Sequence, residues 1–356
     1  MVWEPDDRDL EVATVANLTR FLCAEPVHAV RLHRRMEMLM AQMNAITFTP
    51  GGSENLKPTM IEIPVPGPTE VLVRVIAIGV NSIDWKTRAG QGVYPFFDSD
   101  APMVLGWDIA GVVEETGAGV TRFREGDRVF GMPAFPMPAN AYAQYVVAPS
   151  RQLAPTPDKV SDTAAAAAPL SGLTAYQAVV DTLKVGQGER ILIHGAAGAV
   201  GQFAVQIAKA RRAVVTATDV PARLDTLRDL GVDHVIDSEA VDFAETVTHM
   251  DAVLDLVGGD YPVRSLRTMR QGGRMVVLSS PDDVPSANQL AAAGVTATWM
   301  LVEPDHAGLE ALAAMLTFGL LKVPIAETRP LDDVAQLHDL GESGSITGRL
   351  VATVDG

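Results

Sequence analysis

The chain of 356 residues has one cysteine, Cys23, and aromatic residues make up only 5% of it. A single cysteine excludes an intramolecular disulfide and any structural zinc site built from four cysteines. A chain of this kind fits a reducing compartment.

Basic residues are also scarce, since 28 Lys and Arg stand against 44 Asp and Glu and give a formal net charge of -16. A surface of that sign repels nucleic-acid phosphates and anionic lipid head groups, so we expect neither nucleic acid nor membrane as a partner. The sequence has no apolar run long enough to span a bilayer, and its N-terminus lacks the basic and apolar segments of a secretory signal. We therefore expect a cytoplasmic protein.

The pattern of apolar residues divides the chain into segments, and its length favours two domains. Residues 1–42 are typical of two short amphipathic helices broken at Pro26, an N-terminal extension. Residues 43–164 contain short β-rich runs separated by Gly and Pro, which predicts a β-dominated domain. In residues 165–302 strands alternate with helices, which predicts an α/β domain with a doubly wound parallel sheet. Residues 303–356 return to helix and strand pieces that could rejoin the β-rich domain.

The strongest local signal is a strand over 190–194 that runs into a glycine motif and then a helix. A strand, a tight glycine turn and a helix N-terminus present backbone N–H groups to a dinucleotide pyrophosphate. A glycine turn that merely packs a helix on a sheet is the competing interpretation. It is disfavoured because a second strand follows and ends where a ribose-binding residue belongs. The expected cofactor residues here are Gly195, Gly198, Ala199, Val200, Gly201, Thr218 and Asp219.

The end of that second strand carries two conflicting signals for the form of the cofactor. An acid such as Asp219 binds the ribose 2′-OH of NAD, whereas a nearby arginine such as Arg223 accommodates the 2′-phosphate of NADP. A solvated charge at a helix start would explain Arg223 equally well.

Residues 102–113 (PMVLGWDIAGVV), 79–86 (GVNSIDWK) and 172–176 (GLTAY) match a known pattern in the same order. With these motifs, residues 43–356 resemble the medium-chain dehydrogenase/reductase superfamily, in its zinc-free quinone oxidoreductase and enoyl reductase branch. The resemblance implies a GroES-like catalytic domain of residues 43–164 and 303–356, a Rossmann domain of residues 165–302, and a homodimer.

The same resemblance implies that no catalytic zinc is bound. The positions that hold the metal in the zinc alcohol dehydrogenases of the superfamily correspond here to Asn81, Trp107 and Leu170, which supply neither thiolate nor imidazole. Without a Lewis acid, the acceptor must spread the developing negative charge itself. We therefore expect an enzyme that uses NADP(H), with NAD(H) not excluded, to reduce an activated C=C bond or a quinone.

The resemblance also suggests which side chains act. Candidate donors to the substrate oxygen are Asn81, Lys86 and Tyr94, although a surface lysine and an unrelated tyrosine are the competing interpretations. Further residues expected at the cofactor are Thr174, Gly258, Leu278, Ser279 and Arg349. An acyl-thioester enoyl reductase, a biosynthetic tailoring reductase and a non-catalytic cofactor-binding protein stay open as alternatives.

Overall fold

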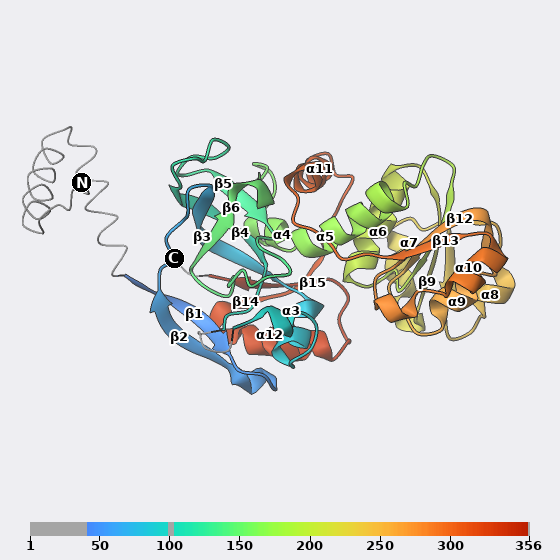
Figure 1. Cartoon of the computed structure of the whole chain (residues 1–356), viewed down its shortest axis with the longest axis horizontal. Helices are drawn as coiled ribbons and strands as arrows, with labels where there is room; N and C mark the ends of the chain where they lie inside the picture. Colours follow the sequence, from blue (N-terminus) through green and yellow to red (C-terminus); the bar gives the residue numbers. More distant parts are fainter. Residues whose placement is uncertain (1–40, 99–102, 355–356) are drawn as a thin grey trace, which may run out of the picture.

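The computed structural model describes residues 41–98 and 103–354. The expected N-terminal extension therefore lies outside the described residues, except for its last two, and Gln42 already begins strand β1 (Gln42–Phe48). Figure 1 shows two lobes side by side along the long axis, with helices α5 (Pro169–Tyr176) and α6 (Ala199–Ala210) between their sheets. Among the described residues, no helix combines the length and the apolar character needed to cross a membrane.

The first lobe is built on the long strand β3 (Glu70–Val80), which pairs antiparallel with β4, β6 and β15. Its seven-stranded sheet has the order β14-β15-β3-β4-β5-β7, with β6 paired to β3. The hairpin of β1 and β2 forms a separate two-stranded sheet. The remaining strands and helices of this lobe are β2 (Leu56–Glu62), α3 (Ser82–Arg88), β4 (Asp108–Thr116), β5 (Arg128–Gly131), β6 (Tyr145–Pro149), β7 (Leu153–Pro155), α4 (Asp162–Ala166), α11 (His306–Thr317), β14 (Ile325–Pro330), α12 (Val334–Glu342) and β15 (Arg349–Thr353).

The second lobe is a six-stranded parallel sheet of order β10-β9-β8-β11-β12-β13. Strand β8 (Arg190–His194) carries Ile191, Leu192 and Ile193, all fully buried, as expected for a parallel strand covered on both faces. The other strands are β9 (Val214–Asp219), β10 (His234–Asp237), β11 (Met250–Asp255), β12 (Met269–Val277) and β13 (Thr296–Trp299), with helices α7 (Leu224–Asp229), α8 (Phe243–Thr246), α9 (Tyr261–Ser265) and α10 (Ala287–Ala293). The fold class predicted from the sequence, a β-rich lobe joined to a doubly wound parallel sheet, is confirmed.

The chain passes from the first lobe toward the second through a run of four fully buried alanines, residues 165–168. Small side chains are required here because the backbones approach closely: a Cβ on Gly79 of β3 would lie 2.3 Å from the carbonyl oxygen of Ala166. This close packing brings the end of β3, the end of α4 and the start of β15 together.

Candidate functional site

The glycine motif forms the turn between β8 and α6. Gly195 has φ +64°, a left-handed conformation that favours glycine, and a Cβ on Gly201 would lie 2.5 Å from the carbonyl oxygen of Ala196. Gly198 is the N-cap of α6, so Ala199 and Val200 occupy its first turn. The first N–H groups of a helix lack partners inside it, and the helix dipole favours an anion there. The turn therefore has the shape and charge needed to hold a pyrophosphate.

The sheet order places this turn at a topological switch point. β8 lies between β9 and β11, and the chain proceeds outward from it on both sides. In open α/β sheets, ligands bind at the carboxyl ends of the strands where the order reverses. The loop after β11 lies at this edge and requires glycine at position 258. Gly258 has φ +81°, and a Cβ there would lie 2.5 Å from the Ser279 hydroxyl. Ser279 and the half-buried Leu278 follow β12, the next strand of the sheet.

Asp219 ends β9 and is bound to the glycine turn. Its Oδ2 accepts a hydrogen bond from the Ala197 N–H at 2.8 Å, and its Oδ1 accepts one from the Val220 N–H at 2.9 Å. Arg223 lies one turn further on and donates to the carbonyl oxygen of Gly344, which follows α12 in the first lobe. Arg223 therefore bridges the two lobes beside the place where an adenosine ribose would sit.

A buried histidine that sequence reasoning missed supports this edge of the sheet. His194 ends β8, is fully buried, and lies 2.8 Å from the Thr218 hydroxyl through Nδ1 and 2.9 Å from the Ser265 hydroxyl through Nε2. Burial lowers the pKa of His194 to about 3, so the ring is neutral. The sequence signal that could have identified His194 is its position directly before Gly195, the first residue of the glycine turn.

Asp255, at the end of β11, is a second buried group at the switch point. Its Oδ1 accepts from the N–H groups of Val257 and Gly258, at 2.9 and 2.7 Å, which fixes the glycine turn after the strand. Burial raises the pKa of Asp255 to about 6, and its Oδ2 is enclosed without a hydrogen-bond partner among the described residues. The carboxyl group therefore shapes the loop at the expected nicotinamide end.

Across from this edge, Asn81 forms the N-cap of α3. It follows β3, and its backbone N–H donates to Asp84 Oδ2 at 2.7 Å, the capping arrangement that starts the helix. Its side-chain amide donates to Asp108 Oδ2 at 2.9 Å, while its oxygen accepts from the Arg349 guanidinium at 2.5 Å. Asn81 is 2% exposed, so its amide is already committed inside the protein.

Arg349, which was expected at the cofactor, is the centre of this buried cluster. It also donates to the carbonyl oxygen of Ala167 at 2.9 Å and lies 3.8 Å from Asp108. Burial raises the pKa of Asp108 to about 7, although the guanidinium opposes that shift. The other oxygen of Asp108 accepts from the Leu170 N–H at 2.9 Å, which joins the cluster to α5. Thr174, one turn further along α5, donates to the Leu170 carbonyl at 2.6 Å.

A second buried chain of polar groups, also missed by sequence reasoning, anchors α3 to α12. Arg88 lies 3.2 Å from His338 Nδ1, His338 Nε2 lies 2.9 Å from the Tyr142 hydroxyl, and that hydroxyl donates to Asp84 at 3.1 Å. A guanidinium can only donate, so His338 Nδ1 accepts the hydrogen bond from Arg88 and the ring proton is on Nε2. His338 Nε2 therefore donates to the Tyr142 hydroxyl, which in turn donates its own hydrogen bond to Asp84. Burial raises the pKa of Asp84 to about 8. Tyr142 and His338 lie far from α3 in the sequence, so no local pattern predicted the cluster.

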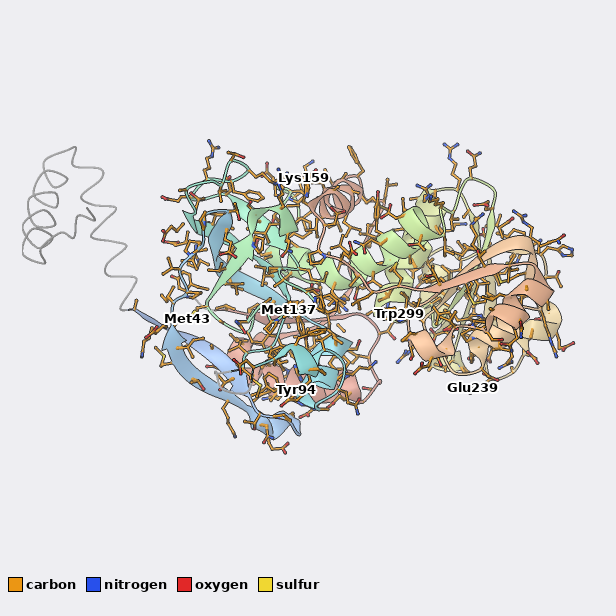
Figure 2. All side chains as sticks on the ribbon, in the orientation of Figure 1. Met43, Tyr94, Met137, Lys159, Glu239 and Trp299 are labelled. Carbon is orange, nitrogen blue, oxygen red and sulfur yellow. The ribbon has the colours of Figure 1, made fainter. Side chains whose placement is uncertain are left out.

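The two remaining candidate donors differ in exposure. Lys86 lies on the exposed side of α3, and within the described chain no acidic side chain forms an ion pair with it. Tyr94 is half-buried and begins the short 3-10 helix Tyr94–Phe96. Figure 2 shows Tyr94 beside α3 on the first lobe. Of the three predicted donors, Lys86 and Tyr94 are therefore free to meet a ligand, whereas Asn81 is bonded internally.

Comparisons with known proteins agree with this geometry. A family model for alcohol dehydrogenase GroES-like domains matches residues 67–158, and one for zinc-binding dehydrogenases matches residues 230–351. The quinone oxidoreductase of Coxiella burnetii superimposes with a TM-score of 0.81 and 32% identity, covering 88% of this chain and all of that chain. A 2-haloacrylate reductase of Burkholderia sp is 32% identical over 317 residues, 83% of this chain and 94% of the relative.

The chain belongs to the zinc-free quinone oxidoreductase branch of the medium-chain dehydrogenase/reductase superfamily. The resemblance seen in the sequence is thereby confirmed. A third relative is a much longer protein, a mycocerosic acid synthase-like polyketide synthase of Mycobacterium tuberculosis. The chain is 32% identical to it over 324 residues but spans only 15% of its length.

The donor set of this family member does not fit the zinc that gives one of the matching models its name. At the three ligand positions, Asn81 is bonded to Arg349, Trp107 is fully buried and donates to the Met137 carbonyl at 2.8 Å, and Leu170 has no ligating atom in its side chain. The Arg349 guanidinium therefore lies next to the position that the catalytic zinc occupies in the zinc-dependent members of the family. Among the described residues, no group of three or more His, Cys, Asp or Glu could hold a metal ion.

Proposed function

We propose that the protein is an NAD(P)H-dependent reductase that transfers hydride to the activated C=C bond of an enone or enal, or to a quinone, without zinc. The observation that carries this proposal is the Arg349–Asn81–Asp108 cluster, which occupies the neighbourhood of the family's metal and offers no Lewis acid to a substrate. A conjugated acceptor needs less activation, because the charge that follows hydride addition is spread to an oxygen that hydrogen-bond donors can hold.

In this proposal the glycine turn of the second lobe binds the cofactor, and side chains of the first lobe bind the substrate. The bound nicotinamide supplies the hydride, two electrons with one proton, and water supplies the second proton of the product. The N–H groups of Ala199 and Val200, in the first turn of α6, would bind the pyrophosphate, while the Gly198 N–H donates to the Gly195 carbonyl at 3.1 Å and fixes the turn. Thr174 would lie near the nicotinamide. Lys86 donates to the substrate oxygen, with Tyr94 as a second donor, while the cap at Asn81 fixes the direction of α3.

For the cofactor we propose a preference for NADPH over NADH. Both carboxylate oxygens of Asp219 are bonded to backbone N–H groups, which offsets the repulsion that a 2′-phosphate would meet. Arg223 lies on the same edge and would exchange its bond to the Gly344 carbonyl for one to that phosphate. A charged acceptor binds a guanidinium more strongly than a neutral carbonyl does.

A substrate screen tests the proposal. The purified protein is mixed with NADPH or NADH and with enals, enones, quinones, 2-haloacrylates and enoyl thioesters, and cofactor oxidation is followed by absorbance. We expect turnover with at least one enone, enal or quinone. Turnover of enoyl thioesters alone would replace this function with acyl-thioester reduction. Dinucleotide binding without turnover of any acceptor would indicate a non-catalytic cofactor-binding protein.

We further propose that the protein is a cytoplasmic homodimer joined through β13. This strand is an edge of the parallel sheet, with Thr296 and Trp299 exposed on it, and edge strands present unpaired backbone groups to a second copy. A charge on the edge should block such pairing, so Thr296→Lys should yield monomers in light scattering coupled to size exclusion. Met137→Lys, at an exposed position on the other lobe (Figure 2), is the matched control that should stay dimeric. A monomeric wild-type protein would refute the proposal.

A further inference from the structure

A second concave site lies on the first lobe, away from the dinucleotide cleft. It is a cavity of about 360 Å³ lined by Thr69, Gly119, Thr121, Arg122, Pro149, Ser150 and Arg151. Thr69 directly precedes β3, and Asn81 directly follows it. The eleven residues of β3 therefore separate this cavity from the candidate active site, a distance of roughly 35 Å for an extended strand.

The lining of the cavity is basic, although the protein as a whole carries a net charge of -16. Two arginines and no acidic residue line it. The Arg122 guanidinium is held by Glu310 of α11 at 2.8 Å, while its Nε is enclosed and has no hydrogen-bond partner among the described residues. Arg151 is exposed and forms no ion pair within the part of the chain that the structure describes. The Arg122 guanidinium is thus held in place by Glu310, and the Arg151 guanidinium is free to bind a ligand.

Hydroxyl groups add further donors around the same cavity. Ser150 is only 8% exposed, and its hydroxyl forms no hydrogen bond to any described residue, nor do those of Thr69 and Thr121. The rim is fixed by the backbone, because the Ser150 N–H donates to the Thr69 carbonyl at 3.1 Å. These three hydroxyl groups are therefore available to a ligand in the cavity.

We propose that this cavity binds the phosphate group of a small phosphorylated molecule. A phosphate monoester has several acceptor oxygens in a tetrahedral arrangement, which matches donors that converge from three separate loops. Arginine guanidinium groups suit phosphate because their planar fork of N–H donors forms paired, charge-assisted bonds. The proposal does not depend on the reductase activity, because none of the lining residues belongs to the dinucleotide cleft.

Calorimetric titration tests the site. The wild-type protein, saturated with NADPH so that the glycine turn is filled, is titrated in separate runs with inorganic phosphate and with phosphoserine at constant ionic strength. Arg151→Gln, at an exposed position, should weaken binding about tenfold, the loss expected for a charge-assisted bond. Arg122→Gln should do the same, and thermal melting checks that loss of the Glu310 contact leaves it folded. Arg124→Gln is the matched control, because this arginine is highly exposed and pairs with Asp127 outside the cavity.

Each outcome bears on the proposal. Binding of both probes supports a site that recognises phosphate itself, and binding of phosphoserine alone supports a site for an organic phosphate. In either case Arg151→Gln must weaken binding and Arg124→Gln must not. Equal loss in both variants would show diffuse attraction of anions to the lobe and would overturn the proposal, as would the absence of binding of either probe to the wild-type protein.

Discussion

His194 Nδ1 lies 2.8 Å from Thr218 Oγ1, so a side chain at the end of β8 is bonded to one at the end of β9. The direction of this bond follows from its neighbours. The Ser265 hydroxyl donates its only proton to the Tyr261 carbonyl at 2.7 Å, so it accepts from His194 Nε2. A neutral imidazole with its proton on Nε2 accepts at Nδ1, and Thr218 therefore donates to it. Together with the bond from Ala197 to Asp219, this contact sets the spacing between the two strands that frame the proposed adenosine site.

We predict that His194 positions the dinucleotide site. His194→Phe keeps an aromatic ring against Phe243, whose centroid lies 4.4 Å away, but loses both hydrogen bonds. The KM for NADPH should rise about tenfold, equivalent to about 1.4 kcal/mol, while kcat and the substrate KM stay near wild type. His194→Asn keeps an acceptor near Nδ1 and should recover most of the loss. Steady-state kinetics with cofactor and substrate varied in turn measures this, and an unchanged cofactor KM in His194→Phe would contradict it.

The parts of this molecule that the sequence predicts well are those encoded locally. The glycine turn is an example, because Gly195, Gly198 and Gly201 recur every three residues within one strand–turn–helix unit. Their structural requirements, a left-handed φ and a close backbone approach, are met within a few residues. The alternation of strands and helices after residue 190 is local in the same sense, and it predicted the parallel sheet.

The buried polar clusters could not be predicted because their members are distant in the sequence. Asp84 and His338 meet through Tyr142, and Asn81 meets Arg349 across 268 positions. Each of these residues alone is equally compatible with a surface charge, a ligand contact or a core hydrogen bond. The interpretation of Asn81 as a substrate donor rested on its motif, whereas its hydrogen bonds depend on how β3, β4 and β15 pair.

Asp84 should make stability depend on pH. Burial raises its pKa from an ordinary 3.8 to about 8, so between those values the folded protein holds a proton that the unfolded chain releases. The contribution of Asp84 to stability then falls as pH rises through this window, by up to about 1.4 kcal/mol per pH unit for one group. Buried neutral histidines such as His194, whose pKa is lowered from 6.5 to about 3, give the opposite slope between those two values, so the comparison of variants and not the net slope reports on Asp84. Asp84→Asn resembles the protonated acid and should make the slope shallower by that amount. Asp108, with its pKa raised to about 7, retains a slope of the same sign.

Urea unfolding of the wild type and Asp84→Asn from pH 5 to pH 8 measures the two slopes. Asp158→Asn, which removes an exposed carboxylate, is the control and should retain the wild-type slope. If Asp84→Asn has the same slope as wild type, then Asp84 is ionised in the folded protein, and the other buried carboxyl groups, Asp108 and Asp255, carry the effect.

The absence of zinc ligands at Asn81, Trp107 and Leu170 predicts activity that does not depend on metal. Pre-incubation with a strong chelator should leave kcat unchanged, and elemental analysis of the purified protein should find no stoichiometric zinc. One tightly bound zinc per chain, lost together with activity, would show that a different donor set forms a catalytic site.

Arg223 should determine the preference for NADPH. Arg223→Ala should raise the KM for NADPH by about 10- to 100-fold, the loss expected when a charged hydrogen bond is removed, and should affect the KM for NADH much less. The variant also loses the bond to the Gly344 carbonyl, so any effect common to both cofactors reports on that contact. Arg228→Ala is the control, since Arg228 is exposed on α7 and pairs with Asp225. Equal effects of Arg223→Ala on both cofactors would remove Arg223 from the phosphate site.

Lys86 should contribute to hydride transfer rather than to folding. It is exposed on α3, whose start is fixed by the cap at Asn81 and whose end is anchored through Arg88 to Glu342 at 2.8 Å. The helix therefore does not need the lysine charge for its position. An ammonium group near the substrate would stabilise the developing oxyanion, and loss of one such donor lowers kcat by roughly 10²- to 10³-fold.

Lys86→Met keeps much of the apolar stem and removes the charge, so it should lower kcat by that factor with little change in melting temperature. Lys159→Met is the matched control, because this exposed lysine lies on the opposite side of the first lobe from Tyr94 (Figure 2) and should retain full activity. The double variant Lys86→Met/Tyr94→Phe tests whether the Tyr94 hydroxyl donates to the oxyanion when the lysine is absent. If Lys86→Met turns over the best substrate at the wild-type rate while the double variant is inactive, the donor is Tyr94 and Lys86 is a surface residue.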